Sequence, residues 1–188
     1  MLNSRDIIEK ILNTTNNNET TLVAIDGLGG SGKSTLSKEI KAAKVSCDIV
    51  EMDDFYLPES ERTQSGCLFD LERLEKEVLY PLKANGKASY YKYDWDKDRV
   101  AVTATSVSSR IVIVEGVYSY SRTLRSYYKH SIWVECDFDT RLMRGVQRDG
   151  EEMRKTWVEI WMPAEQEYKD SQQTDRHVDF IFLGNLGN

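Results

Sequence analysis

The chain has 188 residues, 40% of them hydrophobic and 30% charged, which fits one compact domain with a packed core. Its 31 acidic and 25 basic residues leave a formal net charge of −6, which argues against a nucleic-acid surface or attachment to anionic lipid. Three widely spaced cysteines and two histidines predict neither a disulfide framework nor a histidine metal centre. Because no apolar run reaches the ~18 residues of a membrane helix, we expect a cytoplasmic protein without nucleic-acid or membrane partners.

Hydrophobic periodicity divides the chain into an N-terminal helix with a polar linker over residues 1–20 and a single domain over residues 21–188. In chain order the predicted elements are helix 4–12, strand 21–25, helix 33–43, strand 45–52, helix 69–83, strands 88–95, 110–114 and 131–136, helices 139–148 and 152–168, and strand 178–183. Pro163 must kink or restart the last helix because it removes an internal hydrogen bond. Buried strands that alternate with helices predict an α/β fold, a parallel sheet with helices on both faces.

A glycine-rich loop follows the first strand and fits the pattern G-x-x-x-x-G-K-[ST] between a strand and a helix. Glycines let backbone N–H groups turn inward around a phosphate, and the start of the next helix adds its positive dipole end. Lys33 supplies a charge for the outer phosphates, and the Ser34 hydroxyl suits Mg²⁺. The motif predicts a nucleotide site of the P-loop NTPase type made by Gly27, Gly29, Gly30, Ser31, Gly32, Lys33, Ser34 and Thr35. A guanine-specific switch is disfavoured because the sequence has no Asn-Lys-x-Asp element.

Two adjacent carboxylates, Asp53 and Asp54, follow the second predicted strand and precede Phe55 and Tyr56. Acidic residues at this end of a strand, beside the phosphate loop, are candidates to hold Mg²⁺ or to accept a proton from a hydroxyl group. Successive residues of an extended chain point in opposite directions, so we expect one of the pair to face the phosphates. A polar turn with an aspartate helix cap explains the same residues, and both interpretations stay open at this point.

Three arginines share one face of the predicted helix 139–148, because Arg141, Arg144 and Arg148 fall at i, i+3 and i+7. Guanidinium groups match phosphate oxygens and neutralise charge that develops during phosphoryl transfer, so this stripe is a candidate phosphate clamp. A solvated basic face is the alternative.

Aromatic side chains alternate at positions 91, 93 and 95 of a predicted strand and therefore share a face. This face suits a planar acceptor such as a pyrimidine base. Ordinary strand packing explains the same pattern equally well.

Taken in order, these motifs resemble the uridine kinase / phosphoribulokinase family of P-loop kinases over roughly residues 21–183. The resemblance is carried by the run from Gly27 to Thr35, by Asp53-Asp54-Phe55-Tyr56, by Tyr93-Asp94-Trp95, by Ile113-Val114-Glu115-Gly116, and by Asp139-Thr140-Arg141-Leu142 continuing to Arg148-Asp149. It implies ATP and Mg²⁺ as cofactors and a small lid, which includes the arginine helix and closes over the nucleotide. It also allows self-association into a homo-oligomer.

The resemblance implies a role for each matching residue. Asp53 would be the general base, with Asp54 as the alternative. Lys33, Arg144 and Arg148 would act with that base, Ser34, Glu115 and Asp53 would hold Mg²⁺, Arg141 would contact both nucleotide and acceptor, and Tyr56 and Tyr93 would contact the acceptor.

The acceptor is less well defined than the chemistry, because the stretch Asp94–Arg99 lacks the histidine that reads the base in nucleoside-phosphorylating members. Our first hypothesis is transfer of the γ-phosphoryl group of ATP to the 5′-hydroxyl of uridine or cytidine. The second is the same chemistry on pantothenate, a sugar or a sugar phosphate, for which Lys92, Lys97 and Arg99 are available. The third is a regulatory nucleotide-binding protein without an acceptor.

Overall fold

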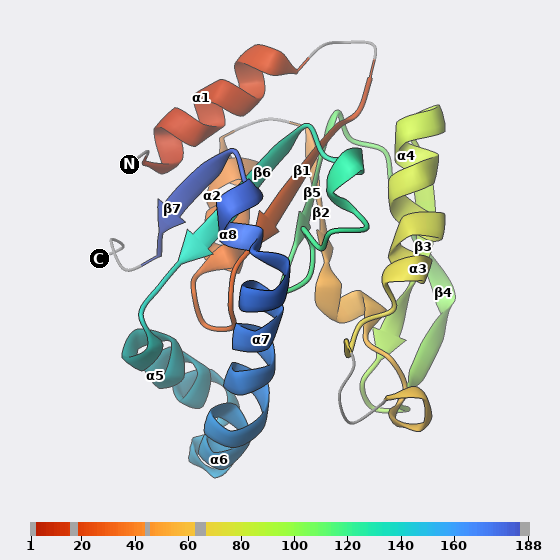
Figure 1. Cartoon of the computed structure of the whole chain (residues 1–188). Helices are drawn as coiled ribbons and strands as arrows, with labels where there is room; N and C mark the ends of the chain where they lie inside the picture. The colour runs from red at the N-terminus through yellow and green to blue at the C-terminus, as the bar shows by residue number, and fades with distance from the viewer. Residues whose placement is uncertain (1–2, 16–18, 44–45, 63–66, 185–188) are drawn as a thin grey trace.

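The computed structural model describes residues 3–15, 19–43, 46–62 and 67–184. A five-stranded sheet forms its centre, with the order β2-β5-β1-β6-β7 and parallel pairing throughout (Figure 1). The strands are β1 (Thr21–Asp26), β2 (Cys47–Glu51), β5 (Ile111–Glu115), β6 (His130–Glu135) and β7 (Phe180–Leu183). Each coincides with a strand predicted from the sequence.

The predicted helices are found in the predicted order, although two of them contain wider turns, and a short helix that was not predicted follows the last of them. They are α1 (Ser4–Thr14), α2 (Lys33–Ala42), α3 (Leu71–Leu74), α4 (Tyr80–Asn85), α5 (Phe138–Asp149), α6 (Arg154–Thr156), α7 (Met162–Gln172) and α8 (Thr174–His177). A π-helical turn over Glu75–Leu79 joins α3 to α4, and another over Trp157–Trp161 joins α6 to α7. Pro163 lies in the first turn of α7, directly after the second π-turn, and the backbone keeps helical angles at Trp161 and Met162.

Helices cover both faces of the sheet, which confirms the predicted layers. One face packs against α1 and α2 in a core that comprises Ile7, Ile11, Val23, Ile25, Leu36, Ile40, Cys47, Ile111, Ile113, Ile132 and Val134. The other face packs against the α3–α4 segment through Leu22, Val50, Val112, Val114, Leu74, Val78, Leu79 and Leu82. The N-terminal helix is therefore part of the core, and residues 16–18 of the predicted linker lie outside the described residues.

The predicted strand 88–95 does not join the parallel sheet. It forms β3 (Ala88–Asp94), which pairs antiparallel with β4 (Arg99–Val107) in a separate two-stranded sheet. β4 is not among the elements predicted from the sequence, because its side chains are largely exposed, including Val102 at 85%, and form no buried apolar run.

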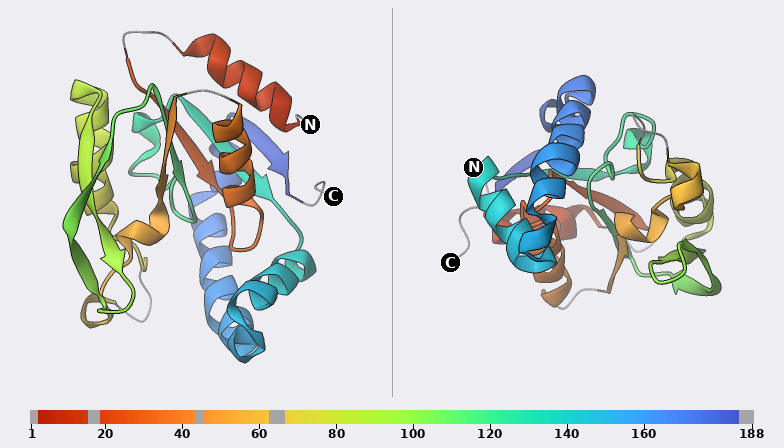
Figure 2. Two further views of the ribbon diagram at one scale, coloured as in Figure 1. Left: turned by 180° about the vertical axis from the view of Figure 1, so that it is seen from behind. Right: turned by 90° about the horizontal axis from the view of Figure 1, so that it is seen from below.

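The carboxyl ends of the parallel strands meet at one edge of the sheet, as expected for a site in such a fold. Helices α5 to α7 extend beyond this edge on one side, and the β3–β4 hairpin extends beyond it on the other (Figures 1 and 2). None of the helices in the described part of the chain is both long enough and apolar enough to cross a membrane.

Candidate active site

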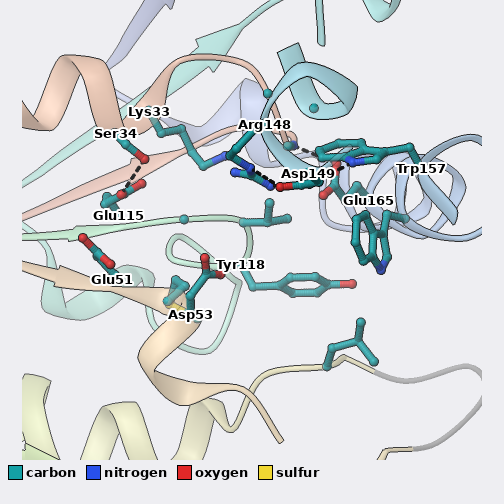
Figure 3. Close-up of a pocket in the computed structure, with 18 of the residues that line it drawn as sticks. Lys33, Ser34, Glu51, Asp53, Glu115, Tyr118, Arg148, Asp149, Trp157 and Glu165 are labelled. Atoms are coloured by element: carbon teal, nitrogen blue, oxygen red, sulfur yellow. Dashed lines mark hydrogen bonds and ion pairs between the residues drawn. The ribbon is translucent and has the colours of Figure 1, made fainter. Parts of the chain in front are cut away.

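A cleft of about 780 Å³ opens at this edge of the sheet, a volume typical of small-molecule sites (Figure 3). It brings together the phosphate loop, the segments after β2 and β5, and the helices α5 to α7. The predicted site residues in its lining are Gly29, Gly30, Gly32, Lys33, Ser34, Thr35, Asp53, Tyr56, Glu115, Arg144 and Arg148. The other predicted site residues, Gly27, Ser31, Tyr93 and Arg141, are buried and do not line the cleft.

The phosphate loop connects the central strand β1 to α2. Gly30 and Gly32 have φ angles of 75° and 103°, in the left-handed region that favours glycine. A Cβ atom on Gly30 would lie 2.5 Å from the carbonyl oxygen of Arg141, so α5 approaches the loop closely. Gly32 caps α2 without a side-chain hydrogen bond, and a phosphate is the expected acceptor for the N–H groups at this helix start.

Lys33 and Ser34 begin α2 and face the ends of neighbouring strands. The ammonium group of Lys33 donates to the carbonyl oxygen of Leu28 at 3.1 Å. The Ser34 hydroxyl donates to Oε1 of Glu115, the last residue of β5, at 2.8 Å (Figure 3). Burial raises the pKa of Glu115, while the charge of Lys33 and the Ser34 hydrogen bond oppose that shift.

This hydroxyl–carboxylate pair fits Mg²⁺, which prefers hard oxygen ligands. In the described part of the chain, no group of three or more His, Cys, Asp or Glu side chains is arranged to hold a metal ion. A sparse protein ligand set suits Mg²⁺ all the same, because this ion keeps several waters and binds one or two protein groups together with substrate phosphates. Ser34 and Glu115 are therefore the residues that would hold it.

The turn after β2 directs the side chains of the two adjacent aspartates into different surroundings. Met52–Phe55 forms a 3₁₀ turn in which Asp54 is buried; its carboxylate accepts a hydrogen bond from the Tyr90 hydroxyl and forms an ion pair with the Lys92 ammonium, both at 2.9 Å. Asp53 instead lines the cleft opposite the phosphate loop (Figure 3). Enclosure by protein raises the pKa of Asp53, and the charges of Lys33 and Arg148 partly offset this effect.

Glu51 is a further carboxylate in the cleft, and it was not predicted from the sequence as a site residue. It ends β2 and is paired in register with Glu115 of β5, so both side chains reach the same edge of the sheet. The sequence contained an indication of this position, since Glu51 stands two residues before Asp53 at the end of a predicted strand.

The three arginines of α5 have different surroundings, although they share one side of the helix. Arg148 pairs with Asp149 and, with Arg144, lines the cleft. Arg144 donates to the carbonyl oxygens of Gly30 and Gly184. Arg141 is only 4% exposed and does not line the cleft, and its guanidinium group lies 3.7 Å from the carboxylate of Glu165. The surroundings differ because the helix rise separates residues at i and i+7 by about 10 Å along the axis.

The aromatic lining differs from the predicted wall. A register shift in the hairpin between Tyr91 and Tyr93 breaks the alternation, and Tyr91 is 40% exposed outside the cleft. The Tyr93 ring packs behind Tyr56 and Trp95, and its hydroxyl is hydrogen-bonded to Arg62 and Asp98. The aromatic side chains at this end of the cleft are Tyr56, Phe69, Trp95 and Tyr118.

Helix α7 and the π-turn before it contribute two further residues that sequence reasoning missed. Oε2 of Glu165 accepts a hydrogen bond from the backbone N–H of Gly29 at 2.7 Å, and burial raises the pKa of this carboxylate. The Trp157 ring covers both Gly29 and Gly145 of α5. No local pattern indicates either contact, because each joins residues more than ten positions apart.

A Gly145→Ala substitution is expected to lower the free energy of unfolding by about 1–3 kcal/mol. The new Cβ atom would lie 2.5 Å from two ring carbons of Trp157, which is almost fully buried. Urea denaturation measures the change. Gln147→Ala, at an exposed position of the same helix, is the control and is expected to stay within about 0.5 kcal/mol of the wild type. Equal stability of the Gly145 variant and the wild type would contradict this packing.

Comparison with known proteins identifies the family of the chain. A model of the Phosphoribulokinase / Uridine kinase family matches residues 62–177. The chain belongs to this family. A uridine kinase of Staphylococcus epidermidis is 26% identical over 183 residues, covering 87% of each chain. A uridine kinase of Staphylococcus aureus is 32% identical over 147 residues, covering 71% of this chain and 70% of its own.

The fold is similar to that of a solved structure. A protein of Bacillus stearothermophilus, described as a possible uridine kinase, superposes with a TM-score of 0.69 at 20% identity, covering 95% of this chain and 98% of its own. Its similarity supports the fold. Membership of the phosphoribulokinase / uridine kinase family makes the chain a P-loop kinase, a nucleotide-binding phosphotransferase.

Proposed function

We propose that this kinase transfers the γ-phosphoryl group of ATP to the 5′-hydroxyl of uridine or cytidine, with Mg²⁺ held by Ser34 and Glu115. The observation that carries the proposal is the position of Asp53. Its carboxylate lies in the cleft between the phosphate loop and an aromatic-lined end that suits a planar base. The names of the staphylococcal relatives support the same acceptor class.

In this proposal Asp53 accepts the proton of the acceptor hydroxyl while the hydroxyl oxygen attacks the γ-phosphorus. Lys33, Arg144 and Arg148 stabilise the charge on the transferred group, which is the main catalytic task in phosphoryl transfer. Mg²⁺, when bound, neutralises charge on the β- and γ-phosphates. Helices α5 to α7 form the lid that shields the reaction from water.

Charge in the cleft favours an uncharged acceptor over a sugar phosphate or pantothenate. The basic residues among the described lining are Lys33, Arg144 and Arg148, which come from the phosphate loop and α5. Lys92 pairs with Asp54, and Lys97 pairs with Asp94. Arg99, the third cation available for an anionic acceptor, does not line the cleft, and neither lysine lines it.

The proposal is tested by ADP release from ATP and Mg²⁺ with a panel of acceptors. The panel contains uridine, cytidine, purine nucleosides, fructose, a sugar phosphate and pantothenate. We expect strong stimulation by the two pyrimidine nucleosides. Stimulation by another acceptor alone would keep the kinase chemistry and replace the proposed acceptor. If no acceptor of the panel increased ADP release, a regulatory nucleotide-binding protein would be favoured.

Trp95→Ala is expected to raise the KM for the nucleoside about tenfold without changing the KM for ATP, the scale of one lost base–aromatic stacking contact. The indole lies just after β3, lines the cleft and is 59% exposed, so it is available to a planar ligand. Steady-state kinetics with each substrate varied in turn measures both constants. Tyr91→Ala, on the same strand outside the cleft, is the control, and an unchanged nucleoside KM in the Trp95 variant would remove this residue from the acceptor site.

A further inference from the structure

Helix α7 contacts the phosphate loop and the strand that leads into it at two points, one helical turn apart. Glu165 accepts from Gly29 within the loop at 2.7 Å. Three residues later, the Tyr168 hydroxyl donates to Oδ2 of Asp26 at 2.6 Å. Residues at i and i+3 lie on the same side of a helix, so α7 presents both side chains to the loop together.

Asp26 is a completely buried carboxylate at the end of β1, directly before the loop. Its Oδ1 accepts from the backbone N–H of Gly27 at 2.7 Å, and its Oδ2 accepts from the backbone N–H of Tyr120 at 2.8 Å in addition to Tyr168. One side chain thus joins the start of the phosphate loop, the segment after β5, and α7. Burying a charge is costly unless such hydrogen bonds compensate, and the burial raises the pKa of Asp26 to about 6.

The same contact reaches the acceptor end of the cleft. The Tyr168 ring lies against Tyr118, with 4.0 Å between ring centroids, and Tyr118 lines the cleft near the aromatic residues (Figure 3). Tyr118 has a φ of 71°, an unusual conformation for a residue other than glycine, which the surrounding packing must hold in place. Tyr168 supplies part of that packing and the hydrogen bond to Asp26 at once.

We propose that Asp26 and Tyr168 are positioning residues, which hold the phosphate loop and Tyr118 in one arrangement relative to α7 and thereby set both nucleotide affinity and turnover. Neither side chain lines the cleft, so each acts through Gly27, Tyr120 or Tyr118. The part that concerns turnover rests on the proposed function. The part that concerns nucleotide affinity depends only on the phosphate loop.

The test compares Tyr168→Phe and Asp26→Asn with a matched control. Tyr128→Phe removes another enclosed tyrosine hydroxyl, one that has no hydrogen-bond partner among the described residues. ATP affinity is measured by calorimetry, turnover by ADP release with uridine, and folding by thermal unfolding. We expect ATP affinity to fall about tenfold in both test variants and to change less than twofold in the control.

Two further readouts separate positioning from loss of fold. The Asp26→Asn protein is expected to melt below the wild type, because an amide nitrogen cannot accept the hydrogen bonds that the carboxylate receives from Gly27 and Tyr120, so its ATP affinity is measured at a temperature where thermal unfolding shows the protein to be folded. The double variant is expected to lose no more affinity than the weaker-binding single variant, because both substitutions break the same contact.

The proposal would be overturned if Tyr168→Phe bound ATP with wild-type affinity. It would also be overturned if Tyr128→Phe lost as much ATP affinity as Tyr168→Phe. If Asp26→Asn does not fold, Tyr168→Phe decides the matter alone, since it removes one hydroxyl and leaves the buried volume unchanged. If no acceptor increased ADP release by the wild-type protein, the proposed function would be refuted. The ATP affinities of the variants would still decide whether Asp26 and Tyr168 position the phosphate loop.

Discussion

A protein with Asp53→Asn is expected to bind ATP with near wild-type affinity and to phosphorylate its acceptor at least about 100-fold more slowly. Asparagine keeps the size of the side chain in the cleft but cannot take the proton of the attacking hydroxyl. Calorimetry with ATP measures the first property, and steady-state ADP release with uridine measures the second. The expected result is a loss in kcat with little change in the dissociation constant for ATP.

The neighbouring Asp54→Asn variant is the matched control, because its carboxylate is turned into the protein toward Tyr90 and Lys92. It is expected to lose stability, since a buried hydrogen-bonded carboxylate is disturbed, while the folded protein keeps most of its turnover. Full activity in the Asp53 variant together with an inactive, folded Asp54 variant would assign the base to Asp54.

The wild-type pH profile provides a second check on Asp53. A general base acts in its deprotonated form, and enclosure raises the pKa of Asp53 from its ordinary value. Activity is therefore expected to rise with increasing pH through that raised pKa and to level off above it. The residual activity of Asp53→Asn should not show this rise with pH. The same rise in the variant would mean that another group is responsible for it.

Lys33→Ala is expected to weaken ATP binding by about 10- to 100-fold, the scale of a lost hydrogen bond to a charged group, and to slow phosphoryl transfer as well. The side chain is largely buried at the start of α2, with its ammonium group held by the carbonyl oxygen of Leu28 in the phosphate loop. ATP therefore meets a charge that is already in position.

Calorimetry with ATP and with ADP measures the effect of Lys33→Ala, and the larger loss is expected for ATP because the outer phosphates carry the contact. Lys38→Ala, at an exposed position of the same helix, removes a charge of the same sign away from the cleft and is expected to bind both nucleotides like the wild type. Near-wild-type ATP affinity in the Lys33 variant would contradict the assignment of the phosphate loop.

The sequence by itself determined the chain order of the five parallel strands and of the helices that cover them, the phosphate loop, and the carboxylates Asp53 and Glu115 at or just after the ends of strands. Each of these features depends on residues that are close together in the sequence. Buried parallel strands appear as continuous apolar runs, and a phosphate loop requires glycines and a lysine at fixed spacing between a strand and a helix. The parallel sheet then places the strand ends at one edge without any further information.

Only the tertiary structure decided which of two adjacent aspartates faces the cleft, because the choice depends on Tyr90 and Lys92 from the hairpin that receives Asp54. The hairpin strand β4 was missed for a related reason, since an exposed strand carries no strong apolar pattern.

The contacts between α7 and the phosphate loop illustrate the same limit most clearly. Gly29 meets Glu165, and Asp26 meets Tyr168, across more than 130 positions of the chain. Periodicity reports how one segment folds, whereas these hydrogen bonds depend on where a late helix packs against an early loop. That position is set by the whole core, so the buried carboxylate under the phosphate loop and its tyrosine partner became visible only in the folded chain.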